Sequence, residues 1–234
     1  MILYLYVEVK DKMGFEIEST FLDEYNNVVA TAKTTNNREP ILYYNGKSYQ
    51  QTTWPKKLKR HNTSTTYPLH SKRNWTLGFE IKSDDKVVSE YYDDAINVGK
   101  KFIFKKNVGF LAITLEDKFY QVYKVGYGNE NWHNYCIKDE TGNTVGIVRR
   151  FYGEVCKAKI YIEDKKYLLL ALLVADIEII TYAGCKAQEC PDPSAGNYIS
   201  ILKEEKEMYD KKFIARVEQT NTQTQLESIQ QQNL

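Results

Sequence analysis

The chain has 234 residues, of which 42% are hydrophobic and 27% charged, with a formal net charge of +1. This composition is typical of a globular protein of one large domain with an appendage, or of two small domains. Its four cysteines are too few for a disulfide-stapled secreted fold, and its 19 tyrosines favour strands over helices.

The amino-terminal stretch "MILYLYVEVK" predicts a strand rather than a secretory signal. It has no basic n-region, and its apolar run stops at Val7. We therefore expect a cytoplasmic location.

Up to about Glu163 the hydrophobic pattern has a period of two, and three phrases share one form. Each has an aromatic-x-Ile strand, a polar turn and a Val-rich return strand, which predicts a hairpin. The turns are Asn26-Asn27, Asp84-Asp85 and Thr141-Gly142-Asn143. Further strands are expected at Ile2–Val9, Lys101–Lys105, Gly109–Thr114, Phe119–Val125 and Ala158–Ile162. So many antiparallel strands indicate a barrel or a sandwich.

One part of the strand region is strongly basic. Between Pro40 and Phe79 there is no Asp or Glu, while seven Lys and Arg residues occur there. Its centre is "TTWPKKLKRHNTSTTYPLHSKRNW", which we interpret as a loop. The candidate ligand-binding residues are Trp54, Lys56, Lys57, Lys59, Arg60, Lys72 and Arg73.

The stretch from Tyr167 to Ala183 is the most apolar part of the chain and predicts a helix. As a helix it is about 25 Å long, against about 30 Å of hydrocarbon to cross, and it contains Asp176 and Glu178. Asp164 can cap its start, and Gly184 can follow its end. Because the segment is apolar on every face, we expect it inside a barrel rather than in a membrane.

The run "GEVCKAKIYIEDKKYLLLALLVADIEII" resembles the last strand and central helix of the tubby C-terminal-like superfamily, and is most similar to the LURP-one-related proteins, with phospholipid scramblases as more distant relatives. The phrase "IKDETGNTVGIVRR" is similar to the strand–turn–strand phrase of that family. The resemblance covers about 135–184 and is diffuse before that. It implies a closed antiparallel barrel of roughly twelve strands around a central hydrophobic helix, formed by residues 1–184.

The last fifty residues extend beyond that domain. Pro191 and Pro193 predict a linker over 185–197. Apolar residues at three- and four-residue steps predict an amphipathic helix over 198–218, and the Gln/Asn-rich residues 219–234 predict a disordered polar tail.

No catalytic or cofactor-binding pattern is evident, so we expect a protein that is not an enzyme and needs no cofactor. His61 and His70 lie in the basic segment without neighbouring carboxylates, and a His133–Cys136 pair lacks a third partner. Cys185 and Cys190 have no second Cys/His pair nearby, which is a weak pattern for a metal or a disulfide. For Asp176 and Glu178, a structural role at the barrel mouth and a ligand role both stay open.

The basic segment supports three interpretations. It is a solvated loop, a site for an anionic phospholipid or phosphoinositide headgroup at a membrane surface, or a site for single-stranded nucleic acid. The near-neutral total charge disfavours nucleic acid, and lipid connections of the tubby-like superfamily favour the membrane. An alternative class is a protein-interaction module acting through the helix at 198–218. A scramblase-like activity is a weaker alternative, because no terminal membrane helix and no acylation-type cysteine run is present.

Overall fold

The computed structural model describes residues 1–10, 16–34, 40–60, 75–98, 106–126, 132–151, 156–180 and 203–232. These ranges contain thirteen strands and are mostly β. The strands are β1 (Ile2–Val9), β2 (Ile17–Asp23), β3 (Val28–Thr34), β4 (Pro40–Tyr44), β5 (Lys47–Gln51), β6 (Lys56–Lys59), β7 (Trp75–Ser83), β8 (Lys86–Val98), β9 (Lys106–Leu115), β10 (Lys118–Gly126), β11 (Trp132–Lys138), β12 (Thr144–Phe151) and β13 (Cys156–Ile162). The strand predicted at Lys101–Lys105 lies outside the described residues.

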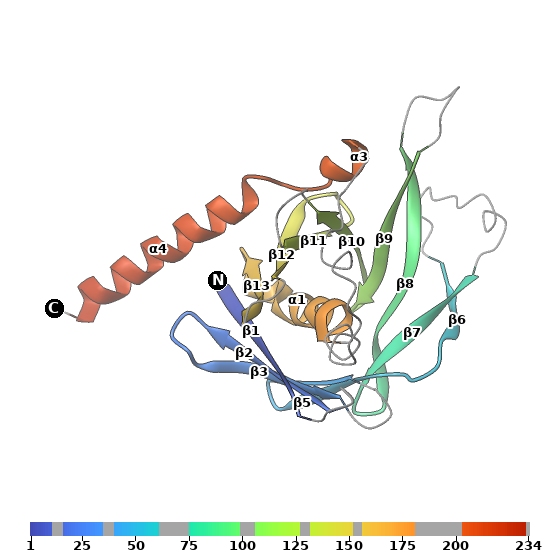
Figure 1. The fold of residues 1–234 in the computed structure, drawn as a ribbon, viewed down its shortest axis with the longest axis horizontal. Helices are drawn as coiled ribbons and strands as arrows, with labels where there is room; N and C mark the ends of the chain where they lie inside the picture. The colour runs from blue at the N-terminus through green and yellow to red at the C-terminus, as the bar shows by residue number, and fades with distance from the viewer. Residues whose placement is uncertain are drawn as a thin grey trace.

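Twelve of these strands form a closed antiparallel barrel, which confirms the predicted fold class (Figure 1). The strand order is β5-β4-β3-β2-β1-β13-β12-β11-β10-β9-β8-β7, and the barrel closes because β5 also pairs with β7. Strand β6 is additional. It pairs with β7 on the edge that β5 also uses, with Lys56 opposite Gly78.

The predicted turns form as expected. Asn26, Asp84 and Asp85 adopt positive φ angles of 63°, 51° and 62°, and Gly142 adopts 84°. Asn, Asp and Gly tolerate this left-handed conformation better than other residues, which explains why the strands reverse there.

The apolar helix lies inside the barrel (Figure 1). It consists of the short 3₁₀ turn η1 (Lys165–Tyr167), the α-helix α1 (Leu168–Ala175) and the π-helical turn η2 (Asp176–Ile180). Asp164 caps its start, because its side chain accepts a hydrogen bond from the Lys166 backbone N–H. Burial all round explains the sequence of α1, where every residue except Leu169 is buried.

The helix departs from the prediction over its last turns. Residues 176–180 are π-helical rather than α-helical. The predicted end at Ala183 and the cap at Gly184 lie outside the described residues.

The carboxyl-terminal segment folds back on the outside of the barrel. Phe213, Ile214 and Val217 are buried in a second apolar cluster that includes Cys136 and Ile147. Cys136 and Ile147 face outward from β11 and β12, whereas the residues next to them in each strand point inward to the helix. The segment therefore covers an apolar patch of barrel wall that would otherwise face solvent.

The helix boundaries differ from the prediction here. The helix predicted over 198–218 is interrupted: its described residues form α3 (Lys203–Lys206) and, after a turn, the start of α4 (Phe213–Gln232). The predicted disordered tail over 219–234 is wrong as far as Gln232, because α4 continues to that residue. The predicted linker, 185–197, lies outside the described residues. Figure 1 shows α4 continuing away from the barrel toward the C-terminus.

Candidate functional site

Strand β6 contains three of the predicted site lysines, so the prediction of a loop is wrong over Lys56–Lys59. A strand points successive side chains to opposite faces. Lys56 and Leu58 therefore share one face of the β6–β7 ribbon, and Lys57 and Lys59 share the other. Lys72 and Arg73 of the predicted site, like His61 and His70, lie outside the described residues.

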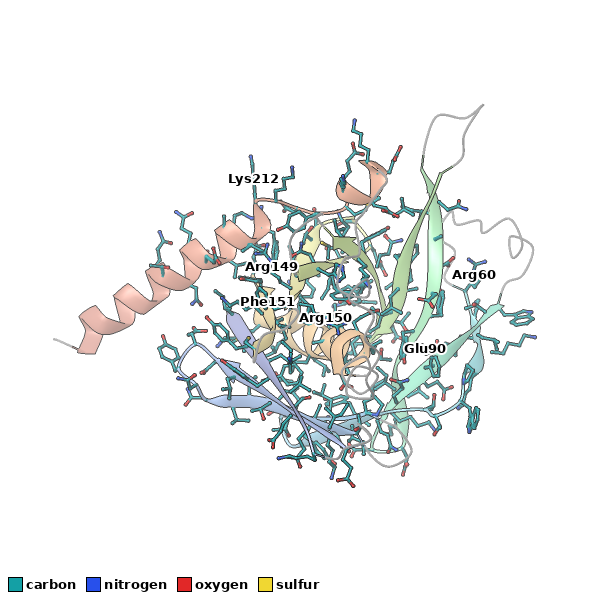
Figure 2. All side chains as sticks on the ribbon, in the orientation of Figure 1. Arg60, Glu90, Arg149, Arg150, Phe151 and Lys212 are labelled. Carbon is teal, nitrogen blue, oxygen red and sulfur yellow. The ribbon has the colours of Figure 1, made fainter. Side chains whose placement is uncertain are left out.

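On the first face of the ribbon, the cations form ion pairs with acidic residues of the protein. Lys56 forms an ion pair with Glu80, and Arg60 forms one with Asp94, which is buried. Between them Leu58 is buried against the barrel wall. Figure 2 shows Arg60 beside β6. These two cations attach β6 to the barrel, and the sequence alone did not reveal their acidic partners.

The second face is exposed, and together with the exposed Trp54 that precedes β6 we call it the outer strip: Trp54, Lys57, Lys59 and Leu77. Lys57 and Lys59 are exposed, and Leu77, directly opposite Lys57 on β7, is 60% exposed. Trp54, just before β6, is 78% exposed. The Lys57 Nζ atom lies 4.4 Å from the centre of the Trp75 ring, a cation–π contact. The outer strip thus combines ammonium groups with exposed apolar side chains.

The two arginines at the end of β12 lie on opposite sides of the strand. Arg149 points outward, where its guanidinium donates hydrogen bonds to Asn134 Oδ1 (3.1 Å) and Tyr209 Oη (2.9 Å). Arg150 is buried on the opposite side of the strand (Figure 2). Arg149 therefore helps to hold the carboxyl-terminal segment on the barrel.

The barrel wall opens between β9 and β10. Their ladder ends at the pair Leu111 and Val122. Beyond it, β9 continues beside β8 and β10 continues beside β11. A cavity of about 390 Å³ lies in this gap. We call it the β9–β10 opening.

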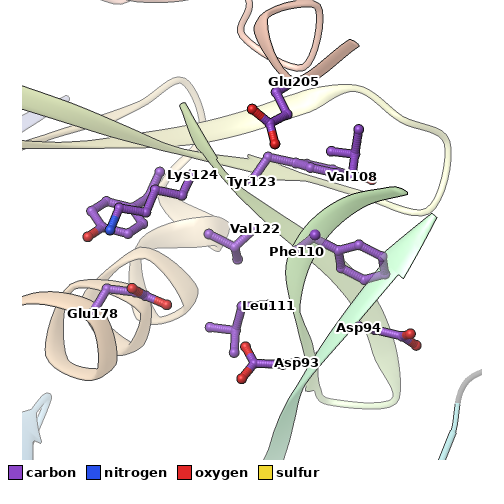
Figure 3. A pocket seen from close by; sticks show the side chains of 12 residues that line it. Asp93, Asp94, Val108, Phe110, Leu111, Val122, Tyr123, Lys124, Glu178 and Glu205 are labelled. Atoms are coloured by element: carbon purple, nitrogen blue, oxygen red, sulfur yellow. The ribbon is translucent and has the colours of Figure 1, made fainter. Parts of the chain in front are cut away.

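Charged groups from several elements surround the opening (Figure 3). Glu178 of η2 approaches it from inside the barrel, Asp93 of β8 lies at its exposed edge, and Lys124 extends from β10. Outside, Glu205 of α3 lies above it. Lys124 also lies over the ring of Tyr135, at 5.9 Å from its centre.

Burial changes the acidity of these groups. It raises the pKa of Glu178 to about 7, although Lys124 and Arg150 act in the opposite direction. It also lowers the pKa of Lys124, an effect that Glu178 opposes. Because Glu178 titrates near neutral pH, this site can exchange a proton or stabilise a cation.

Asp176, two residues before Glu178, is buried in the barrel and is 4% exposed. Burial raises its pKa to about 7. Burial, together with the charges of Asp176 and Glu178, also raises the pKa of Tyr91. The two helix carboxylates noted in the sequence are therefore both perturbed, but Glu178 is the one that lines the opening.

Lys124 and Asp93 were not among the sequence candidates. The signal that could have identified them is a charged residue at an inward-facing position of a strand. An example is "FYQVYKVG", where Lys124 shares a face with Val122. That signal becomes readable only once the inward face of the strand is known.

Comparison of the chain with protein-family models, with curated proteins and with solved structures finds no match. The resemblance to the tubby-like superfamily therefore stays a prediction. Among the residues that the structure describes, no helix has the length and apolar character needed to cross a membrane. The same residues contain no group of three or more His, Cys, Asp or Glu side chains suited to holding a metal ion.

Proposed function

We propose that this protein is a non-enzymatic module that binds anionic phospholipid at a membrane surface through the outer strip. The observation that carries the proposal is the exposure of Leu77 beside Lys57 and Lys59, with the exposed Trp54 just before the strand. Anionic headgroups attract nearby ammonium groups, and amphipathic aromatic side chains favour the interface. Lys56 and Arg60 support the strip from behind and are not direct headgroup ligands, because each has an acidic partner.

Co-sedimentation with vesicles tests this proposal. Neutral phosphatidylcholine vesicles are compared with vesicles that also contain phosphatidylserine or a phosphoinositide. Each lysine near an anionic surface contributes about 1 kcal/mol, so a Lys57→Ala/Lys59→Ala variant is expected to bind anionic vesicles about 30-fold more weakly. Trp54→Ala is expected to weaken binding further, and higher salt to weaken wild-type binding.

The matched control is Lys86→Ala/Lys118→Ala, which removes the exposed lysines at the first positions of β8 and β10. It loses the same net charge but leaves the outer strip intact, so it should bind like the wild type. Equal losses in the two double variants, or no preference for anionic vesicles, would refute the proposal.

A second candidate function is a protein-interaction module, and the extension of α4 favours it. The helix is docked at Phe213 and Val217 and continues to Gln232 away from the barrel (Figure 1). Ending the chain after Glu218 keeps the docked residues and removes the extension. If α4 mediates self-association, light scattering will show a larger mass for the full chain than for this truncated chain. Two monomeric species would exclude self-association through α4.

A further inference from the structure

The β9–β10 opening is a separate site from the outer strip. It forms because two neighbouring strands stop pairing after Leu111 and Val122, so that a gap leads from outside the barrel to the end of the central helix. The cavity of about 390 Å³ is within the usual size of small-ligand sites, roughly 300–1,000 Å³. Unlike the apolar barrel interior below it, this cavity has ionisable walls.

The walls favour a positively charged ligand. Four carboxylates and one lysine line the cavity: Asp93, Asp94, Glu178, Glu205 and Lys124. Among the described residues, Asp94 forms an ion pair with Arg60, and Arg150 of β12 acts together with Lys124 on Glu178. The three carboxylates apart from Asp94 still outnumber these two cations.

The positions of the carboxylates also favour a positively charged ligand. In Figure 3 the carboxylate of Glu178 lies to the left of the apolar side chains of Leu111 and Val122, and that of Asp93 lies below Leu111. Glu205 lies at the top of the same view, above Tyr123. Carboxylates on several sides of the cavity repel an anion and attract an ammonium group.

We propose that the β9–β10 opening binds a small organic amine, with its ammonium group at Glu178 and Asp93 and its hydrocarbon part against Leu111 and Val122. A bound ammonium supplies a positive charge to carboxylates that the barrel has partly removed from water. The alkyl part replaces water on the two apolar side chains. An organic cation suits this lining better than a metal ion, because the described residues hold no cluster of three suitable ligands.

Amine binding through Glu178 should depend on pH. The groups within electrostatic reach of Glu178 or its neighbours are Lys124 of β10, Arg150 of β12, Tyr91 and Asp93 of β8, and Asp176 on its own helix. With the pKa of Glu178 at about 7, the carboxylate is mostly protonated at pH 6 and mostly ionised at pH 8. An alkylamine stays protonated over this range, so its affinity should rise about tenfold from pH 6 to pH 8.

Isothermal titration calorimetry with n-hexylamine tests the proposal, and hexanoate and 1-hexanol serve as comparison probes. We expect hexylamine to bind the full chain more tightly than either probe, and more tightly at pH 8 than at pH 6. Glu178→Gln should weaken hexylamine at least tenfold at pH 8 and abolish the pH dependence. Asp85→Asn, which neutralises an exposed carboxylate in the β7–β8 turn, should bind like the wild type.

Three results would overturn the proposal: no hexylamine binding, equal affinity for hexanoate or hexanol, or unchanged binding by a folded Glu178→Gln variant. Circular dichroism tests whether the Glu178→Gln variant is folded. If it is unfolded, Asp93→Asn, at the exposed edge of the cavity, is used in its place, with the same expected loss of hexylamine affinity. Vesicle binding and amine binding use different residues, so either proposal can fail without the other.

Discussion

Replacing Asp176 by asparagine removes a carboxyl group from the interior of the barrel while keeping the shape of the side chain. Burial raises the pKa of this group from its ordinary value of 3.8 to about 7. The folded chain therefore binds the proton of Asp176 more tightly than the unfolded chain does. The stability that this proton contributes is fully present below pH 3.8 and is lost as the pH rises through about 7.

The size of the effect follows from the two pKa values. Relative to a group that never ionises, the Asp176 carboxyl lowers the free energy of unfolding by about 4 kcal/mol at pH 8 but only by about 2 kcal/mol at pH 5. Asp176→Asn should thus stabilise the protein at both values, and more at pH 8. Urea denaturation of wild type and variant at the two pH values measures this difference.

Asp85→Asn is the control, since this carboxyl is exposed and its substitution should have little effect at either pH. An Asp176→Asn variant whose stability change is the same at pH 5 and pH 8 would refute burial as the cause. A variant that is destabilised at pH 8 would show that the ionised carboxylate makes a net stabilising contact.

Three further predictions concern packing and ion pairing. Gly78→Ala places a Cβ atom against the Tyr91 carbonyl oxygen, closer than Cβ atoms approach in real structures, so we expect a loss of about 2 kcal/mol in urea denaturation and faster hydrogen exchange in β6; unchanged exchange would contradict this. Leu172→Ala empties a fully buried position on α1 and should cost 2–5 kcal/mol, roughly, whereas a cost below about 1 kcal/mol would mean that the helix is loosely packed. Arg60→Ala leaves Asp94 buried without its cation and should cost about 3–5 kcal/mol at pH 7, a loss that adding Asp94→Asn should partly restore; no restoration would argue against this ion pair.

The sequence predicted the barrel and its helix because both depend on local patterns. Alternating strands and turn residues such as Asp84-Asp85 specify hairpins whatever surrounds them. A helix that is apolar on every face, from Leu168 to Ala175, can be stable in water only if a closed wall surrounds it. These patterns therefore led from residues to architecture without further information.

The carboxyl-terminal segment was predicted less well. Its apolar residues were recognised, but they indicated one helix over 198–218, whereas α4 begins at Phe213 and continues through the polar residues to Gln232. Propensity alone disfavoured that extension, and docking of Phe213 and Val217 on the barrel anchors the helix start. The partner surface, on β1, β12 and β13, is remote in sequence.

The basic segment shows most clearly what the sequence determined by itself and what it left to the tertiary structure. Composition alone established a concentration of Lys and Arg residues without Asp or Glu between Pro40 and Phe79. Only the folded chain decided that Lys56 and Arg60 face Glu80 and Asp94, while Lys57 and Lys59 face solvent. The β9–β10 opening has the same origin, because Glu178, Asp93 and Lys124 meet only when the barrel closes around the helix. Charge and periodicity are properties of neighbouring residues, whereas ion pairs and cavities depend on strands that pair across long distances in the chain.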